Sequence, residues 1–293
     1  MQIGVVGKNA EGWETTELMA SLKRREVPSL FLNFSSLVAR VGYNPPIGVN
    51  IKNTAEELSA LIVRPIGRGS LGEIIFRMDF LHNLEAQGVL VVNSAQTIER
   101  CVDKYYALTF LEKNGVPVPR TVVTESLEEA LKAFHELGGD VVLKPLFGSR
   151  GVGSTRIFDE DIAARIFRSI KLHRGVFYLQ EFIDHGESDI RAFVVNDCVV
   201  AAMRRVGKSW KTNVSQGARP VPIQLNEKLQ SLAVEAARGV GSKVAGVDIL
   251  ESKKGPVIVE INSQPGWRGL QSVSRVKVSD CIVDYVLDVV KDR

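Results

Sequence analysis

The stretch A-G-V-D-I-L-E-S-K-K-G-P-V-I-V-E-I-N, residues 245–262, predicts a β-hairpin with polar side chains set into strands otherwise suited to burial. Its second arm is apolar except for Glu260 and Asn262. These two residues are two positions apart, so their side chains share one face of the strand. A buried carboxylate is costly unless it is paired, hydrogen-bonded or bound to a metal. The hairpin therefore indicates a partner for Glu260.

The length of the hairpin loop decides whether Asp248 meets Glu260. A two- or four-residue loop would place Asp248 opposite Val259. A three-residue loop over 253–255, with Gly255 in the left-handed position of a bulge, places Asp248 opposite Glu260. Lys-Lys-Gly suits this loop, and Asp248, Glu260 and Asn262 then offer the hard oxygen ligands that Mg²⁺ or Mn²⁺ prefers. The alternative is a carboxylate pair that shares one proton without a metal.

A second feature is the glycine-rich stretch F-G-S-R-G-V-G-S, residues 147–154, which lies between two predicted strands. Its glycines permit positive φ and close backbone approach, so their N–H groups could form an anion-binding nest. Lys144 interrupts an apolar strand just before this loop and needs an anionic partner. We interpret the stretch as a hairpin lid over phosphates. The alternative is a hairpin without a ligand, because a glycine loop alone is a weak signal.

A second hairpin is predicted around a tight turn at Asn196 and Asp197, with Val195 facing Cys198. This register places Asp189 opposite Arg204 and gathers both with Arg191 on one face. The alternative is a solvated outer face, the usual place for charges on an antiparallel sheet. The loop W-K-T-N-V-S-Q-G, residues 210–217, adds several donors but on its own suits any exposed connection.

The composition excludes several classes of protein. The chain has 293 residues, 45% hydrophobic and 24% charged, with a net charge of +3, which describes a soluble protein of two or three subdomains. This charge is too small to indicate a nucleic-acid partner, and no apolar run approaches the ~18 residues of a membrane span. The lack of a signal peptide and the three scattered cysteines favour the reducing cytoplasm.

The order of predicted elements divides the chain into three parts. Residues 1–95 alternate strands and helices, which predicts a small, mostly parallel sheet, but neither a dinucleotide fingerprint nor a Walker loop follows the first strand. Residues 96–175 continue a helix predicted over 94–114, then hold a strand at 121–124, a helix over 126–137 and the glycine loop. Residues 176–293 hold both hairpins, a helix near 226–240 and a terminal helix over 280–291.

Together these motifs resemble the ATP-grasp superfamily and, within it, the RimK-type amino-acid ligases. The resemblance runs from about Asn93 to Leu270 and rests on the lysine before the glycine loop, Q-E-F-I, D-I-R, K-T-N, G-V-D-I-L and E-I-N-S-Q-P-G, in this order. It implies an α/β and α+β protein of ATP-grasp fold, in which two α+β subdomains clasp ATP behind an N-terminal Rossmann-like preATP-grasp domain. It also implies that the charges of D-I-R and K-T-N point inward.

The resemblance assigns roles to individual residues. For ATP it implies the phosphate-contacting Lys104 and Lys144, the lid residues Gly148, Ser149, Gly151, Gly153 and Ser154, the adenine hinge Gln180, Glu181, Phe182 and Ile183, and the ribose-binding Asp189. Arg191, Lys211 and Asn213 would act at the reacting phosphates, and Asp248, Glu260 and Asn262 would hold two Mg²⁺ or Mn²⁺ ions. Arg64, Arg204, Ser263 and Arg268 are the candidate substrate contacts. Lys211 departs from the family, whose close members carry arginine there.

The implied activity is an ATP-dependent ligase that forms an amide through an acyl phosphate and releases ADP. R-P-I-G-R-G-S (64–70) and N-S-Q-P-G-W-R-G-L-Q (262–271) most resemble the archaeal branch that adds L-glutamate to coenzymes such as tetrahydromethanopterin. The alternatives are a ligase that modifies a carrier or ribosomal protein tail, a nucleotide-binding regulatory module without turnover, and a Rossmann oxidoreductase, whose fingerprint is lacking. The resemblance further implies a homodimer or homotetramer.

Overall fold

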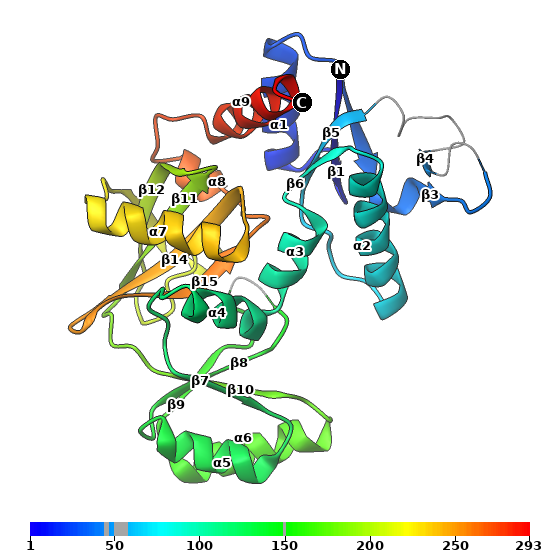
Figure 1. The fold of residues 1–293 in the computed structure, drawn as a ribbon. Helices are drawn as coiled ribbons and strands as arrows, with labels where there is room; N and C mark the ends of the chain where they lie inside the picture. The colour runs from blue at the N-terminus through cyan, green and yellow to red at the C-terminus, as the bar shows by residue number, and fades with distance from the viewer. Residues whose placement is uncertain (44–46, 50–57, 149–150) are drawn as a thin grey trace.

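The computed structural model describes residues 1–43, 47–49, 58–148 and 151–293 (Figure 1). These residues form three sheets that follow one another along the chain, together with their helices and a two-stranded ribbon of β3 (Leu37–Ala39) and β4 (Ile47–Val49). No helix in these ranges has the length and apolar composition needed to cross a membrane.

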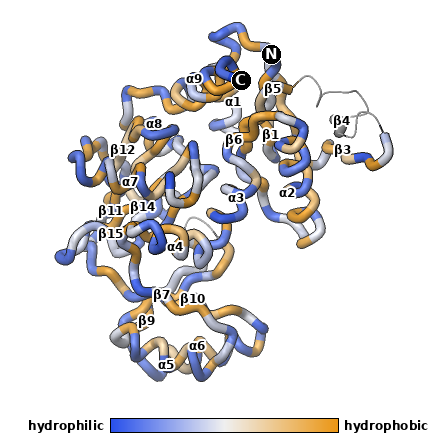
Figure 2. The backbone as a smooth tube through the Cα atoms, in the orientation of Figure 1, coloured by the Kyte–Doolittle hydropathy of each residue, from blue (hydrophilic) through white to orange (hydrophobic). Residues whose placement is uncertain are grey.

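The first sheet is parallel, as the alternating elements predict, and has the order β2-β1-β5-β6. Its strands are β1 (Gln2–Gly7), β2 (Ser29–Asn33), β5 (Leu58–Val63) and β6 (Leu90–Val92), and they run mostly through hydrophobic residues (Figure 2). Helix α2 (Leu71–Ala86) packs on one face, and α1 (Trp13–Arg24) packs on the other. The short helix η1 (Phe34–Ser36) follows β2.

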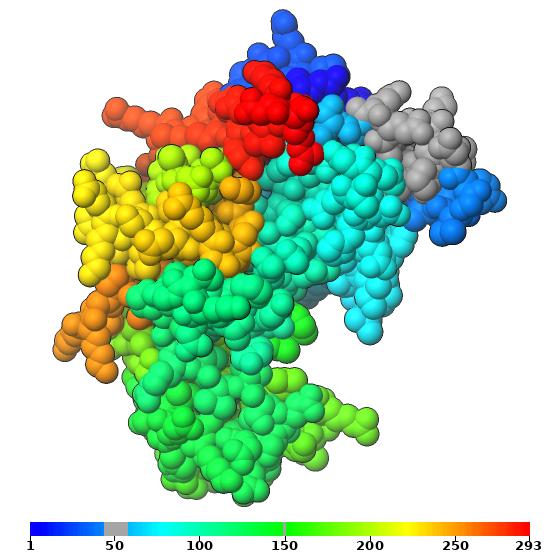
Figure 3. Space-filling view, in the orientation of Figure 1, coloured from blue at the N-terminus to red at the C-terminus, as the bar shows by residue number. Residues whose placement is uncertain are grey.

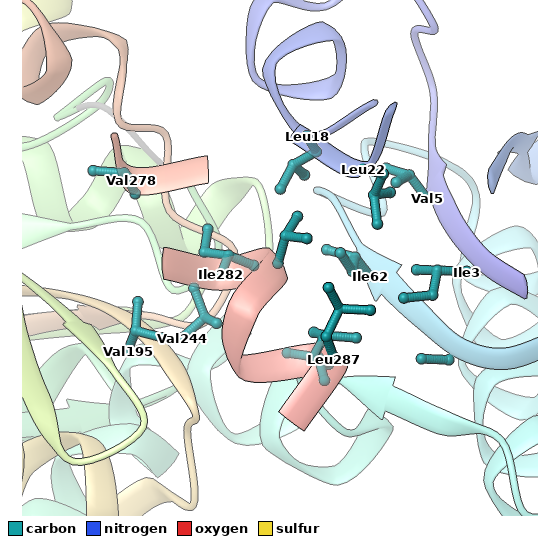
Figure 4. Packing of buried hydrophobic residues seen from close by; sticks show 14 of the residues in the cluster. Ile3, Val5, Leu18, Leu22, Ile62, Val195, Val244, Val278, Ile282 and Leu287 are labelled. Carbon is teal, nitrogen blue, oxygen red and sulfur yellow. The ribbon is translucent and has the colours of Figure 1, made fainter. Parts of the chain in front are cut away.

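The C-terminal helix α9 (Val278–Lys291) returns to this first sheet. Its Ile282 and Leu287 join the core that Leu18 and Leu22 of α1 form with the sheet (Figure 4). At the surface, the Arg25 guanidinium donates to Asp284 at 2.6 and 2.8 Å. The two ends of the chain are therefore held together.

The second sheet is antiparallel, with the order β7-β10-β8-β9. It contains β7 (Thr121–Thr124), β8 (Val141–Lys144), β9 (Thr155–Ile157) and β10 (Phe177–Glu181), and it packs against α5 (Leu127–Glu136) and α6 (Glu160–Leu172). Figure 3 shows this layer, in green, projecting from the rest of the molecule. The sequence prediction missed α6, although the Asp159 side chain accepts a hydrogen bond from Ile162 N at its start.

The third sheet, of order β13-β12-β11-β14-β15, carries both predicted hairpins. Its strands are β11 (Ser188–Val195), β12 (Cys198–Val206), β13 (Arg219–Pro222), β14 (Val244–Ser252) and β15 (Gly255–Asn262). The aliphatic face, which includes Ile190, Val247 and Ile249, packs on α7 (Glu227–Val240) and α4 (Lys104–Lys113). The opposite face carries Asp189, Arg191, Asp248 and Glu260. Short helices η3 (Val214–Gln216) and α8 (Arg268–Gln271) follow β12 and β15.

The helix predicted over 94–114 is in fact two helices, α3 (Ala95–Val102) and α4. Asp103 lies between them in an extended conformation, and its side chain accepts a hydrogen bond from Tyr106 N. Asp is a good N-cap because its oxygen satisfies a free N–H group of the first turn. The break brings Lys104 to the first turn of α4, beside the glycine loop.

Candidate active site

A cavity lies between the second and third sheets, and its wall includes the edge of the glycine loop. It gathers most of the nucleotide- and metal-binding residues expected from the sequence: Lys104, Lys144, Gly148, Gly151, Ser154, Gln180, Glu181, Phe182, Ile183, Asp189, Lys211, Asn213, Asp248 and Glu260. Gly153, Arg191 and Asn262 lie beside it without lining it. Ser149 lies outside the described residues.

Two lysines approach the cavity from different elements. Lys104 Nζ donates to Gly148 O at 2.6 Å, and Lys144 Nζ donates to Gln180 Oε1 at 2.6 Å. Gln180 is itself held by Thr121, because its amide nitrogen donates to the hydroxyl oxygen at 2.9 Å. Burial lowers the pKa of Lys144 to about 8, although nearby Glu260 partly offsets this effect. Burial therefore weakens the preference of Lys144 for its charged form, and an anion that enters the cavity would restore it.

The predicted pairing of Asp248 with Glu260 is confirmed, but the loop that we expected is wrong. The turn has two residues, Lys253 and Lys254, because Ser252 pairs with Gly255. The pairing then passes from Ile249 with Ile258 to Asp248 with Glu260, which leaves Val259 as an extra residue in β15. A β-bulge thus supplies the shift that we had attributed to the loop.

Asp248 is buried and paired with two guanidiniums. Arg191 grips both of its carboxylate oxygens, with one contact of 2.8 Å, and Arg205 lies 3.1 Å from Oδ2. Burial raises the pKa of Asp248, but the two arginines lower it further, and the net pKa lies below its usual value. A Cβ at Gly246 would lie 2.9 Å from Arg191 Nη1, so the glycine makes room for this arginine.

The Glu260 carboxylate has no hydrogen bond or ion pair with any residue in the described ranges. It faces a cavity that also receives Asp248, and Asn262 follows two positions later on the same strand. No group of three His, Cys, Asp or Glu side chains clusters like a metal site in the part of the chain that the structure describes. Two carboxylates and one amide nevertheless provide oxygen donors of the kind that suits Mg²⁺, so these residues fit the metal.

The predicted pairing of Asp189 with Arg204 is wrong. The turn at Asn196 does bring Val195 opposite Cys198, as expected, but Val194 pairs with Val199 and Phe193 with Ala201. The extra residue shifts the register by one, so Asp189 pairs with Arg205. Arg204 lies on the other face and donates to Glu251 at 2.7 Å and to Ser188 at 3.2 Å. The inward-facing arginine of β12 is therefore Arg205, which the sequence interpretation missed.

An aromatic group borders the cavity near the end of β10. The Arg156 guanidinium stacks 3.5 Å from the centre of the Phe182 ring, and Arg156 is held by Asp140 at 2.6 and 2.8 Å. Trp210, also missed in the sequence, lies with its ring centre 6.1 Å from that of Phe182 at nearly a right angle. Glu181 is fixed by Arg120, with Nε donating to Oε2 at 2.8 Å.

The remaining substrate candidates gather at the far end of β15, outside the cavity. Arg64 is buried, donates to Pro265 O at 3.1 Å and stacks 4.7 Å from the Trp267 ring centre. Burial lowers its pKa to about 10. Ser263 is also buried, and its carbonyl oxygen accepts from Asn93 Nδ2. Arg268 is exposed at the start of α8.

Asn93, which directly follows β6, joins the first sheet to the hairpin of β14 and β15. Its amide nitrogen donates to Val244 O at 2.7 Å as well as to Ser263 O, and its Oδ1 accepts from Lys243 N at 2.7 Å and from Val244 N at 3.0 Å. The side chain therefore fixes the start of β14 and the residue after Asn262. A single asparagine after a strand gave no signal of this role in the sequence.

Comparisons with known proteins place these features in a family context. A family model described as a RimK-like ATP-grasp domain matches residues 101–286. A tetrahydromethanopterin:alpha-L-glutamate ligase of Methanocaldococcus jannaschii is 36% identical, over 99% of this chain and 100% of that protein. One from Methanococcus maripaludis is 32% identical, over 100% of both.

The solved structures show the same fold at lower sequence identity. The ATP-grasp ligase PsnB, in complex with a minimal precursor, Mg and ADP, gives a TM-score of 0.76 at 21% identity and covers 99% of this chain and 98% of its own. A RimK domain ATP-grasp protein from Sphaerobacter thermophilus gives 0.75 at 21% identity, with 98% and 100% covered. The chain therefore has the ATP-grasp fold.

Proposed function

This chain belongs to the RimK-like ATP-grasp family, and we propose that it is an ATP-dependent ligase that adds L-glutamate to a small coenzyme such as tetrahydromethanopterin. The observation that carries this proposal is the cavity between the second and third sheets. There, two lysines and a glycine loop face a pair of carboxylates, Asp248 and Glu260. Similarity to the two archaeal ligases over almost the whole chain supports the choice of substrates.

We assign the parts of ATP to the walls of this cavity. The end of β10 and the residues after it, Gln180 to Ile183, would border the adenine, and Asp189 would accept hydrogen bonds from the ribose. Lys104 and Lys144 would contact the phosphates, under a lid formed by Gly148 to Ser154. The assignment is supported by the position of both lysines, Gln180 to Ile183, Asp189, Gly148, Gly151 and Ser154 around one cavity.

Asp248, Glu260 and Asn262 would hold Mg²⁺, and we propose two ions, for which Mn²⁺ could substitute. Bound metal would neutralise charge on the phosphate groups. The protein's own share of this task falls to Lys144 and Lys211, with the Asn213 amide as a hydrogen-bond donor. Arg191 would stand at the acyl phosphate end of the site, where it also holds Asp248 in place.

The reaction needs no side-chain nucleophile. A carboxylate oxygen of the acceptor forms a bond to the γ-phosphorus, the bond to the bridging oxygen breaks, and ADP leaves with that oxygen. The glutamate amine then attacks the acyl carbon, phosphate leaves, and the nitrogen loses a proton. The protein contributes by positioning, by charge stabilisation and by excluding water from the acyl phosphate.

The acceptor would lie beyond the C-terminal end of β15, where Ser263 and Arg268 follow the strand and Arg64 contacts Pro265 and Trp267. Arg268 is exposed and could contact an acidic group of the acceptor directly. Arg64 is buried against Trp267, so it would contribute its positive charge from inside the protein. The domain limits at 95/96 and 175/176 stay a prediction. Strand β10 follows the second limit in sequence but pairs with β8 in the second sheet. A cytoplasmic homodimer or homotetramer is likewise a proposal.

Incubation with ATP, Mg²⁺, isotope-labelled glutamate and tetrahydromethanopterin tests the function. We expect a coenzyme heavier by one glutamyl unit, with ADP formed in equal amount. Arg268→Ala should raise the acceptor KM about tenfold, the effect of one lost charged contact, and an unchanged acceptor KM would remove Arg268 from the site. ADP release only with an acidic carrier or ribosomal protein would redirect the substrate, and ATP binding without ADP release would indicate a regulatory module.

A further inference from the structure

Arg205 lies between the two carboxylates that the proposed function assigns to ribose and to metal. Its Nε donates to Asp189 Oδ1 at 2.7 Å, and its Nη2 donates to Asp189 Oδ2 at 2.5 Å. The same Nη2 lies 3.1 Å from Asp248 Oδ2. The three side chains come from β11, β12 and β14, so one guanidinium spans three neighbouring strands.

All three groups are withdrawn from solvent. The side chains of Arg205, Asp189 and Asp248 are 5%, 6% and 4% exposed, and all three border the cavity. Burying charges in this way is costly unless their geometry and hydrogen bonds compensate for lost hydration. The planar fork of arginine meets this need, since it can grip one carboxylate with two parallel bonds and still reach a second.

The two carboxylates depend on Arg205 to different degrees. Asp248 has Arg191 as a second cation. Asp189 has no other ion pair among the described residues. Loss of Arg205 would therefore leave Asp189 without its only charged partner but would leave Asp248 with one.

We propose that Arg205 is a positioning residue that aims Asp189 at the ribose and, through the same guanidinium, competes with the metal for Asp248. The proposal rests on the proposed function, because it uses that function's nucleotide site. Arg205 places a positive charge 3.1 Å from an Asp248 oxygen, so a dication that approaches this oxygen meets repulsion. Removing the guanidinium should strengthen metal binding and weaken ribose binding, whereas a merely structural role would weaken both.

Two probes separate these effects, because each carries only half of the natural ligand. Binding of Mn²⁺ alone, measured from the paramagnetic resonance signal of the free ion, reports on Asp248 and Glu260. Adenosine alone, followed by calorimetry, reports on base and ribose without phosphate or metal. Arg205→Gln should bind adenosine at least about tenfold more weakly, because a misaligned Asp189 loses its charge-assisted hydrogen bond to the ribose. It should bind Mn²⁺ at least about threefold more tightly, as expected when a nearby like charge is removed.

Arg205→Lys keeps the charge but loses the fork. It should bind Mn²⁺ within about twofold of the unmodified protein while adenosine binding falls as in Arg205→Gln, since a point charge cannot grip Asp189 with two bonds. Arg204→Gln is the matched control. Arg204 is the neighbouring residue on the opposite face of β12, and neither affinity should change.

Opposite shifts of the two affinities in Arg205→Gln support the inference. Parallel weakening of both, or no change in either, overturns it while the proposed function stands. A folded Arg205→Lys that binds adenosine normally also overturns it, even if Arg205→Gln fails to fold. If the unmodified protein binds neither Mn²⁺ nor adenosine, the nucleotide site itself is wrong, and the proposed function falls together with the inference.

Discussion

Binding of the nucleotide should draw a proton onto Lys144. In the free protein, burial lowers the pKa of this lysine to about 8, from an ordinary value of 10.5. A phosphate oxygen beside Nζ favours the charged form and should return the pKa toward that ordinary value. The protein would then take up hydrogen ions as the nucleotide enters, at any pH between these two values.

The size of the effect follows from the two pKa values. At pH 8 the lysine is about half protonated when free and almost fully protonated when bound, so uptake should be about 0.5 proton per nucleotide. Between pH 7 and pH 9 the protonated fraction of the free lysine falls from about nine-tenths to about one-tenth. The affinity for nucleotide should therefore fall about tenfold, or about 1.4 kcal/mol, as the pH rises through this range.

Calorimetric titration with Mg·ADP in buffers of different ionisation enthalpy measures this uptake directly. Phosphate groups, with a second pKa near 6, contribute little above about pH 7.5. Lys144→Arg is the matched control, because its guanidinium stays charged throughout and should bind without uptake at pH 8. Uptake below about 0.1 proton at pH 8, or equal uptake in both proteins, would refute the reasoning.

Two further substitutions test other parts of the site. Glu260→Gln should lower ADP formation at least about a hundredfold, since loss of a metal ligand should cost no less than loss of a group that orients one. Its Tm should stay unchanged, because Glu260 bonds to no described residue. Near-normal turnover would exclude Glu260 as a metal ligand. Gly151 has φ of +70°, and a Cβ there would collide with Asn213 Oδ1, so Gly151→Ala should raise the KM for ATP about tenfold. Gly186 has a similar φ of +67° but open space around it, so Gly186→Ala should leave this KM unchanged. Equal KM values in the two alanine variants would show that the contact with Asn213 is unimportant.

Local patterns in the sequence predicted most of the elements correctly. The parallel first sheet and the strand Thr121–Thr124 follow from hydrophobic runs, and those runs depend on residues close together in the chain. The helix break at Asp103 and the whole of α6 also had local signals, since both Asp103 and Asp159 are good N-caps. The sequence therefore contains local signals for both of these features.

The pairing across strands was harder to predict. In both hairpins an extra residue decides which polar side chains face each other. It is Val259 in β15 and Val200 in β12. A bulge depends on how both faces of a strand pack, so the residues of the turn do not predict it. The pairing of Asp248 with Glu260 was therefore predicted correctly, but from a three-residue loop that the structure lacks. Arg204 was predicted to face inward, whereas Arg205 does.

The sequence by itself determined the kinds of chemical group that the protein offers: lysines and a glycine loop for phosphates, and carboxylates with an amide for a divalent ion. The tertiary structure alone decided which arginines reach those carboxylates and that Asn93 joins the first sheet to the hairpin of β14 and β15. The physical reason is distance along the chain. Asp189 and Asp248 lie on different strands, and only the folded sheet brings both within reach of one buried guanidinium.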